Sequence, residues 1–420
     1  MRWSAVLVCL LLLAPSGLVA QATSDDVATR LKALEERLRA LEAELAALKA
    51  APGTPPAPAA AAAGAPMATV AAPAGAPGGP AGQLPVYGGG SLMSKILNPD
   101  IGVIGNFAGV VGRNRVNPLP SLSLQESEVS LQAIVDPYAR ADFFLAIGEE
   151  GIEVEEGYIT FPALPGGLLV KAGKFRAAFG RQNEWHNHSL PWIDRPLVAF
   201  NLLGGDIGEP DTGIKDAGVS VSRLVPAPGD LFLEATAQVY RGDSGTLFES
   251  SRRSNVAAVG HLRAYKDLTE DTNLELGGSF ARGHNDFGSN FITQAYGFDA
   301  TLRWKPLRRA RYRSFIARTE LTWSRRREPL DVQSAFGYFT SLDYQLGRRW
   351  FLGGRYDWSE RGQDAELHDS SGSFVLTYWP SEFSGVRGQL RRTRYAENST
   401  ANELLFQLLF TLGAHGAHPF

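Results

Sequence analysis

The chain has 420 residues, of which 44% are hydrophobic, 20% charged and 10% aromatic, and its formal net charge is -3. The near balance of 41 basic and 44 acidic residues excludes a nucleic-acid-binding protein, because such proteins carry a strong basic excess. After the first twenty residues, no apolar run is long enough for a transmembrane helix. The single cysteine, Cys9, excludes a disulfide scaffold.

Residues 1–22 have the pattern of a secretory signal peptide. Arg2 supplies the positive charge, residues 5–14 form a short apolar core, and Ala20 and Ala22 are small residues at positions that a signal peptidase reads. We expect cleavage after Ala22, with Ala20 as the alternative, and export of the mature chain. The other interpretation is an uncleaved membrane anchor, but the apolar run is too short for a membrane span.

Residues 23–50 are predicted to form a coiled coil, and residues 51–86 an Ala/Pro/Gly-rich linker. Apolar residues recur at alternating steps of four and three, as in the a/d positions of about three heptads: Val27, Leu31, Leu34, Leu38, Leu41, Leu45 and Leu48. A lone helix cannot bury this stripe, so we expect it to self-associate; the alternative is packing against its own domain. The linker can extend over roughly 100 Å, at ~3.1 Å per residue.

From residue 87 to residue 420, apolar and polar side chains alternate in segments of about ten residues. Val129 and Leu131, for example, share one face of their segment, and Glu128 lies on the other. We count sixteen such segments, beginning near Asp100. The pattern fits two all-β structures: a soluble sandwich with an apolar core, and a transmembrane antiparallel β-barrel with apolar residues toward lipid and polar residues toward the lumen.

Two features favour the barrel. The connections alternate between short turns, such as Asp136-Pro137, and longer polar loops, which is typical of periplasmic turns and outer loops; the long ones are expected at 114–124, 176–213, 241–254, 284–289, 325–333, 361–370 and 397–402. Tryptophans near segment ends share the apolar face, as in the aromatic girdles of membrane barrels: Trp304, Trp323, Trp350 and Trp358. The terminal Phe420 also resembles the C-terminal signal of bacterial outer-membrane proteins. We therefore expect a barrel of about sixteen strands in the bacterial outer membrane, surrounded by its lipid, with the coiled coil in the periplasm.

Two stretches next to each other carry a family resemblance. Residues 172–181 (AGKFRAAFGR) and 186–197 (HNHSLPWIDRPL) look like the region that follows a strand in the phosphate-selective porin O/P family. The order of signal peptide, coiled coil, Ala/Pro linker and barrel is similar to the plan of that family. The resemblance implies a homotrimeric diffusion channel, held through the coiled coil and the barrel walls, with a loop that folds inward to narrow each pore.

The longest connection, Arg176 to Gly213, is the candidate constriction loop. A sixteen-stranded barrel leaves a wide aqueous lumen, so selectivity requires something placed inside it. The candidate site residues of this region are Lys174, Arg176, Arg181, His186, His188, Asp194 and Arg195. The alternative is an outer loop that packs on a neighbouring subunit.

Charges on the polar face of the predicted strands are nearly balanced, with eight basic and seven acidic residues. The candidate pore-wall residues are Arg318, Glu320, Arg355, Asp357, Arg387 and Arg391. Opposite charges two positions apart predict ion pairs along the wall, as in Arg318/Glu320 and Arg355/Asp357, and only Arg387 and Arg391 form a row of one sign. A phosphate-selective pore needs a ladder of Arg and Lys. The sequence therefore favours passive diffusion of small hydrophilic solutes and ions, with anions such as phosphate among them.

Other functions have weaker support in the sequence. His186 and His188 can point the same way from an extended segment and bind a metal ion, but no third ligand is evident, so we assign no metal site and no cofactor. No Gly-x-Ser-x-Gly motif occurs, and we expect no enzymatic activity. Two alternatives stay open: a structural tether between outer membrane and cell wall, through the coiled coil and linker, and an uptake channel selective for a metal or an organic anion.

Overall fold

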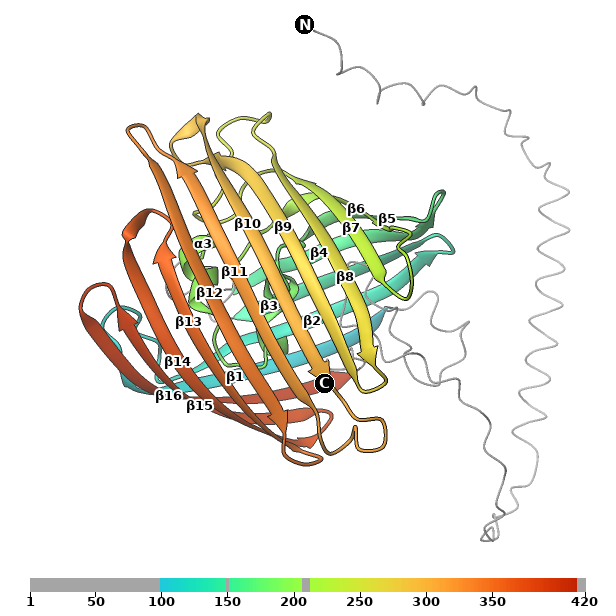
Figure 1. Cartoon of the computed structure of the whole chain (residues 1–420), viewed down its shortest axis with the longest axis vertical. Helices are drawn as coiled ribbons and strands as arrows, with labels where there is room; N and C mark the ends of the chain where they lie inside the picture. Colours follow the sequence, from blue (N-terminus) through green and yellow to red (C-terminus); the bar gives the residue numbers. More distant parts are fainter. Residues whose placement is uncertain (1–98, 149–150, 206–211, 414–420) are drawn as a thin grey trace, which may run out of the picture. The chain divides into compact units, whose positions relative to one another are not determined.

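The computed structural model describes residues 99–148, 151–205 and 212–413. Its sixteen strands form one closed antiparallel barrel, in which each strand pairs with its sequence neighbours and the first strand pairs with the last (Figure 1). The predicted all-β barrel of sixteen strands is therefore confirmed. The predicted signal peptide, coiled coil and linker, and Phe420, lie outside the described residues.

The strands begin at Asp100 and end at Gly413. The first eight are β1 (Asp100–Arg113), β2 (Leu122–Asp136), β3 (Ala139–Gly148), β4 (Gly151–Leu164), β5 (Leu168–Arg176), β6 (Lys215–Leu224), β7 (Phe232–Tyr240) and β8 (Ala257–Thr269). The other eight are β9 (Thr272–Asn285), β10 (Gly288–Trp304), β11 (Phe315–Arg327), β12 (Val332–Gln345), β13 (Trp350–Arg361), β14 (Asp364–Ser381), β15 (Ser384–Tyr395) and β16 (Ser399–Gly413).

Short helices interrupt the connection between β5 and β6. They are the 3-10 helices η1 (Gln182–Glu184) and η2 (Asn187–Ser189) and the α-helix α3 (Leu197–Leu202). Within the part of the chain that the structure describes, no helix has the length and apolar character needed to cross a membrane.

The two faces of the barrel wall differ in polarity, and β15 shows how. Val386 and Leu390 are exposed on the outer face, whereas Arg387, Gln389 and Arg391 are buried on the inner face. Side chains of a strand alternate between its two faces, so a polar residue at every second position lines the lumen with charge. Every charged residue that the sequence assigns to the polar face is buried or half-buried in this way. The barrel therefore has an apolar outer face and a charged interior.

Aromatic side chains gather on the outer face near both ends of the strands. Trp358, close to the end of β13, lies 6.2 Å from Tyr338 between ring centroids, and Trp323 lies 5.1 Å from Phe336. At the beginning of β13, Trp350 and Tyr378 are 4.4 Å apart. Amphipathic rings at both ends of an apolar wall are typical of strands that cross a bilayer.

Several connections differ in length from the prediction. Those expected at 284–289, 361–370 and 397–402 shorten to hairpin turns, because the flanking strands continue through most of these residues. Polar residues beyond the apolar band still satisfy their backbone groups in the ladder, so polarity alone does not mark where a strand ends. On the opposite edge, the connection 305–314 is longer than the turns around it.

Candidate functional site

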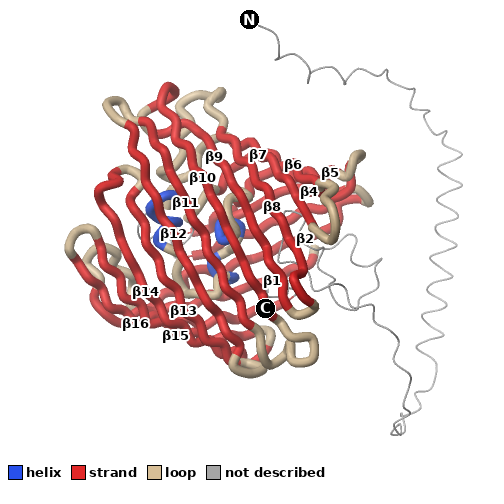
Figure 2. Tube along the Cα trace, in the orientation of Figure 1, coloured by secondary structure: helices blue, strands red, loops and turns tan. Residues whose placement is uncertain are grey.

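The connection between β5 and β6 lies inside the barrel over its described part. Figure 2 shows its helices enclosed by the strands. The amide of Gly180 donates a 2.9 Å hydrogen bond to Ser279 Oγ on β9, and the amide of Ile193 donates a 2.8 Å bond to Gln389 Oε1 on β15. Helix α3 packs against β11 to β14. The loop predicted to fold inward therefore occupies the lumen; we call it the lumenal loop.

Buried apolar side chains hold the lumenal loop to the wall. Trp192 is fully buried and meets Phe339 of β12 edge to face, with ring centroids 5.4 Å apart. At the other end of the loop, Phe175, Phe179 and Ile214 belong to a second buried cluster. Full burial of such a side chain stabilises docking by about 1.5–3 kcal/mol. The loop is thus packed in place as well as hydrogen-bonded.

The predicted pair of Arg318 and Glu320 is wrong. Glu320 Oε1 instead accepts the backbone amides of Arg181 and Gln182, at 3.0 and 2.7 Å, and so anchors the start of the loop. Arg318 forms an ion pair with Asp343 on the neighbouring strand β12. A charged wall residue can bind a group on the neighbouring strand or in the loop as well as one two positions along its own strand. The sequence pattern does not show which of these contacts forms.

Arg355 and Asp357 do pair, with Nε and Oδ2 2.9 Å apart. Arg355 also donates to Asp194 of the lumenal loop: Nη1 lies 2.8 Å from its carbonyl oxygen and Nη2 lies 3.1 Å from Oδ2. Its guanidinium stacks over the ring of Trp192, 4.8 Å from the centroid. Arg355 therefore links the wall, the loop and the buried apolar cluster.

Asp194 is the point where the loop meets the basic part of the wall. Its carboxylate also accepts a 2.8 Å hydrogen bond from Arg391 and a 2.5 Å bond from Gln389. Burial alone would raise the pKa of Asp194, but the positive charges of Arg355 and Arg391 outweigh burial and lower the pKa to about 2. Asp194, Arg355 and Arg391 line a small cavity.

Arg387 differs from the other wall arginines. It donates to Thr377 Oγ1 at 3.2 Å, to the carbonyl oxygen of Trp192 at 3.1 Å and to Gln407 Oε1 at 2.8 Å. All three acceptors are neutral, and no ion pair of Arg387 is found among the described residues. Its charge therefore acts on the lumen without a neutralising carboxylate.

Arg176 and Arg195 both form hydrogen bonds with other residues of the loop. Arg176 donates to Glu155 Oε1 and to the carbonyl oxygen of Thr212, both at 3.1 Å, and Arg195 donates to Asn187 Oδ1 at 2.8 Å. Both guanidiniums are almost fully buried. Arg176 therefore joins the two ends of the loop, Arg195 joins residues within it, and neither faces open solvent.

Arg181 and Lys174 complete the predicted loop set. Arg181 Nη1 forms a 3.0 Å ion pair with Glu275 on β9, so it binds the loop to the wall. Lys174 lies within β5, where Nζ contacts Glu153 at 3.0 Å, and Glu153 is 59% exposed. Lys174 therefore belongs to an exposed ion pair outside the constriction, contrary to its predicted place in the loop.

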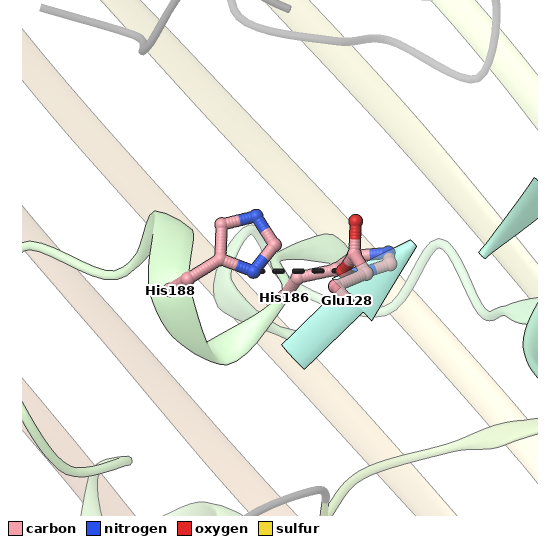
Figure 3. Close-up of side chains that lie close together, drawn as sticks. All are labelled: Glu128, His186 and His188. Carbon is pink, nitrogen blue, oxygen red and sulfur yellow. Dashed lines mark hydrogen bonds and ion pairs between the residues drawn. The ribbon is translucent and has the colours of Figure 1, made fainter. Parts of the chain in front are cut away.

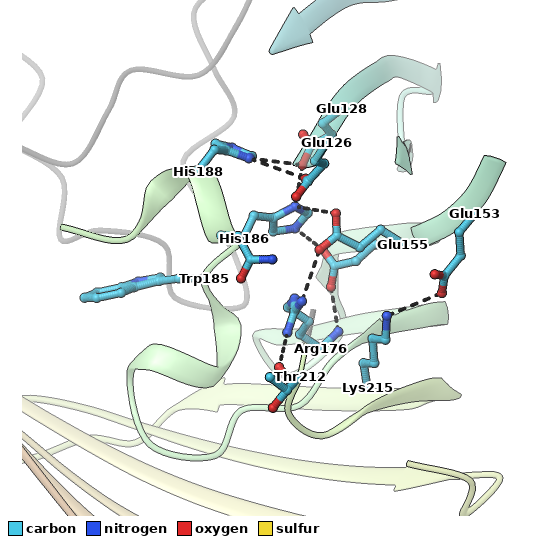
Figure 4. A network of polar contacts seen from close by, with 12 residues as sticks. Glu126, Glu128, Glu153, Glu155, Arg176, Trp185, His186, His188, Thr212 and Lys215 are labelled. Carbon is cyan, nitrogen blue, oxygen red and sulfur yellow. Dashed lines mark hydrogen bonds and ion pairs between the residues drawn. The ribbon is translucent and has the colours of Figure 1, made fainter. Parts of the chain in front are cut away.

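The two histidines of the loop lie against a group of carboxylates (Figure 4). Glu128 Oε2 lies 2.6 Å from His186 Nδ1, and Glu156 Oε2 lies 3.1 Å from His186 Nε2. His188 Nδ1 lies 3.5 Å from Glu128 Oε2. Burial lowers the pKa of His186, but Glu155 and Glu128 outweigh burial and raise it well above its ordinary value. Imidazole and carboxylate groups are ligands that can hold a divalent metal ion.

The alternation pattern places Glu128 on the polar face of its strand, but it does not identify Glu126, Glu155 or Glu156 as part of this group. The last two are consecutive, and simple alternation would place them on opposite faces of β4. The pairing with β3 shifts register between Phe144 and Leu145, opposite Glu156 and Val154, so that Glu155 is the extra residue of a β-bulge. Both carboxylates are buried as a result.

The charges of the lumen are separated in space. Carboxylates concentrate on β2 to β4, where Glu126, Glu128, Asp142, Glu155 and Glu156 are buried, whereas Arg355, Arg387 and Arg391 lie on β13 and β15. The lumenal loop contacts both regions, through His186 and Asp194. The buried carboxylates Asp357, Asp369 and Glu403 lie among the arginines of β13 to β16, so the larger excess of one sign is on β2 to β4.

No family model matches the chain. An uncharacterized protein of Aquifex aeolicus is 28% identical over 395 residues, which cover 78% of this chain and 81% of that protein. Pseudomonas putida OprB aligns with a TM-score of 0.53 at 11% identity, over 76% of this chain and 95% of that chain. The anion-selective porin of Comamonas acidovorans aligns with a TM-score of 0.52 at 11% identity, over 74% and 98%. These likenesses show that the chain has the fold of outer-membrane porins.

Proposed function

We propose that this protein is an outer-membrane porin that lets small hydrophilic solutes and ions diffuse passively through its lumen. The observation that carries the proposal is the polarity of the closed wall. Apolar and aromatic residues such as Phe374, Leu390 and Leu404 are exposed on its outside, and charged residues such as Arg391 and Glu403 are buried inside it. An apolar outer face suits surrounding lipid, and a charged inner face suits a water-filled lumen. A soluble protein would instead bury its apolar residues inside.

The lumenal loop sets the size and charge filter in this proposal. Solutes pass beside the loop and through the field between the carboxylates around Glu128 and the arginines around Arg391. The mechanism is diffusion limited by pore radius and lining charge, without a chemical step. Enzymatic activity is not part of the proposal.

The solute range follows from the partners of the wall arginines. Asp194 pairs with both Arg355 and Arg391, Asp357 pairs with Arg355 at 2.9 Å, and Glu403 pairs with Arg391 at 2.8 Å. Arg387 is the wall arginine without such a partner. An unpaired cation such as Arg387 favours anions weakly and does not amount to a phosphate ladder. We therefore propose a general pore that admits anions such as phosphate, rather than a strictly phosphate-selective member of the O/P family.

We further propose a trimer with its coiled coil in the periplasm. An even number of strands returns both ends of the barrel to one side of the membrane. The heptad pattern of residues 27–48 supports association of several chains. One structure with this fold, OmpT of Vibrio cholerae, is described as a trimer form and aligns with a TM-score of 0.50 at 10% identity, over 75% of this chain and 99% of that chain.

Planar bilayer recording tests the proposal. Purified mature protein added to a lipid bilayer is expected to give stepwise conductance increases, in groups of three if the trimer inserts as a unit. Folding is checked beforehand by circular dichroism and by the heat-dependent gel shift of a β-barrel. Correctly folded protein that inserts into liposomes but never conducts would contradict the porin proposal.

Deleting residues 27–84 separates conduction from assembly. The truncated chain is expected to keep the unit conductance, because the barrel closes without that segment, and to lose the triple steps. Triple steps that persist would show that the barrel walls alone hold the trimer.

A further inference from the structure

Two histidines of the lumenal loop and three glutamates of the wall converge on one point, and several of their atoms lack a partner there. His186 and His188 come from the loop, Glu126 and Glu128 from β2, and Glu155 from the bulge of β4. Figure 3 shows the two imidazoles on either side of Glu128. We call these five residues the His/Glu cluster.

The cluster contains three buried atoms without a hydrogen-bond partner among the described residues: Glu126 Oε1, Glu155 Oε2 and His188 Nδ1. Each of the three residues is 7% exposed or less. All three atoms lie within 4 Å of another member of the cluster. A buried polar atom without a partner costs about 1–3 kcal/mol, and three at one place indicate that a shared partner belongs there.

The spacing of the atoms matches the coordination shell of a metal ion. Glu128 Oε2 lies 2.6 Å from His186 Nδ1 and 3.5 Å from His188 Nδ1. Glu155 Oε2 lies 3.2 Å from His186 Nδ1, and Glu126 Oε1 lies 3.9 Å from His188 Nδ1. Ligand atoms bound at about 2.1 Å in a tetrahedron are about 3.4 Å apart. The ligand atoms of Glu128, His186 and His188 lie within 4.8 Å of one another, as do those of Glu126, Glu128 and Glu155. An ion held by the first three residues can therefore take a fourth ligand from Glu155 or Glu126 after side-chain adjustment.

Groups around the cluster already orient its ligands. Glu156 Oε2 lies 3.1 Å from His186 Nε2, which leaves Nδ1 directed at the cluster. Arg176 Nη2 donates to Glu155 Oε1 at 3.1 Å, which leaves Oε2 of the same carboxylate directed inward. Carboxylate partners of a histidine and donors to a ligating carboxylate are the usual second layer of a metal site.

Protonation of both imidazoles is the competing explanation. Four glutamates, with Glu156 included, face Arg176 and the two histidines, and two imidazolium protons neutralise as much charge as one divalent ion. Charge alone therefore does not distinguish the two states. Even with both imidazoles protonated, Glu126 Oε1 and Glu155 Oε2 have no hydrogen-bond donor at suitable geometry among the described residues. An ion bound by His186, His188 and Glu128 offers a partner to one of these two atoms directly.

We propose that the His/Glu cluster binds one divalent first-row transition metal ion, such as Zn²⁺, and that this ion ties the lumenal loop to β2 and β4. Imidazole nitrogen together with carboxylate oxygen suits this class of ion better than Mg²⁺ or Ca²⁺, which prefer oxygen alone. The inference rests on the geometry of the described residues and goes beyond passive diffusion.

Titration calorimetry with ZnCl₂ on the full mature protein, purified with a chelator and then freed of it, tests the site. One equivalent per chain is expected to bind in competition with an excess of Mg²⁺. The double variant His186→Ala with His188→Ala is expected to bind at least about 100-fold more weakly, and Glu155→Gln, which keeps its volume, about 10- to 100-fold more weakly.

The matched control is His415→Ala with His418→Ala, a second histidine pair that lies outside the described residues. This control is expected to keep both the tight zinc site and the conductance of the original protein. X-ray absorption at the zinc edge of the original protein is expected to show two imidazole ligands. That readout does not depend on whether any variant folds.

Tight binding that persists in the His186/His188 variant, binding that only the His415/His418 variant loses, or an absorption spectrum without imidazole would each overturn the proposal. The outcome is independent of the porin proposal. A protein that conducts but binds no zinc contradicts the metal site alone, and a protein that binds zinc but never conducts contradicts the channel alone.

Discussion

Asp194 of the lumenal loop accepts a 2.8 Å hydrogen bond from Nη1 of Arg391 on β15, although 197 positions separate the two residues in the sequence. The contact joins the middle of the loop to β15, whereas the two ends of the loop continue into β5 and β6. Together with the bonds of Ile193 and Trp192 to Gln389 and Arg387, it fixes the middle of the loop to the wall.

Asp194→Asn is expected to loosen the loop. The change removes the carboxylate that Arg355 and Arg391 share, although Arg355 keeps Asp357 and Arg391 keeps Glu403. The cost is therefore expected to be smaller than the about 3–5 kcal/mol of a buried charge that loses its only partner. We expect a lower Tm by circular dichroism and a larger, noisier single-channel conductance. Glu382→Gln, at the exposed turn between β14 and β15, is the control and is expected to change neither. An unchanged conductance in Asp194→Asn would show that the loop does not restrict the current.

The same carboxylate predicts a dependence on acidity. The pKa of Asp194 is lowered to about 2, from 3.8, so its stabilising contribution is complete above about pH 4 and is lost as the pH falls through 2. The difference corresponds to about 2 kcal/mol. Tm measured from pH 5 down to pH 2 is expected to fall more steeply for the original protein than for Asp194→Asn. Parallel curves for the two proteins would contradict this role of Asp194.

Arg387→Gln is expected to shift ion selectivity toward cations. Arg387 carries a lumenal charge that no described carboxylate neutralises, so its removal subtracts one positive charge from the field. The reversal potential in a KCl gradient measures this shift. Arg253→Gln removes a charge from the exposed β7–β8 connection and is the matched control, with no expected shift. Equal reversal potentials for both variants would place Arg387 away from the ion path.

Gly180→Ala is expected to weaken the start of the loop. Gly180 has φ +61°, and an added Cβ would lie 2.5 Å from Glu320 Oε2, the carboxylate that accepts the amides of Arg181 and Gln182. The backbone conformation alone costs about 1 kcal/mol for an L-residue, and displacement of Glu320 adds to it. We expect a lower Tm together with a larger conductance.

Gly229→Ala is the control for that substitution. Gly229 has a similar φ, +68°, in the turn between β6 and β7, and an added Cβ meets nothing within 4 Å. It carries the same backbone strain without the contact to Glu320. Equal losses of Tm in the two variants would mean that strain, and not the displacement of Glu320, causes the effect.

The barrel, and the face on which most wall residues lie, can be predicted from local sequence patterns. A strand that crosses from water through lipid needs an apolar side chain at every second position on its outer face, so local alternation predicts sixteen strands and the inward side of Arg387 and Arg391. The β5–β6 connection is by far the longest, and its length predicted a loop that enters the lumen. That length, too, can be read along the chain. These features depend on residues close together in the chain.

The contacts between side chains distant in the sequence could not be predicted in this way. Arg318 pairs across the strands with Asp343, Glu320 holds the loop backbone, and Lys174 lies in an exposed ion pair. The β-bulge turns Glu155 inward beside His186, which alternation alone does not predict. The physical reason is that such contacts depend on strand register, on closure of the barrel and on where a long loop lands. Those relationships join residues distant in the sequence, and no local pattern records them.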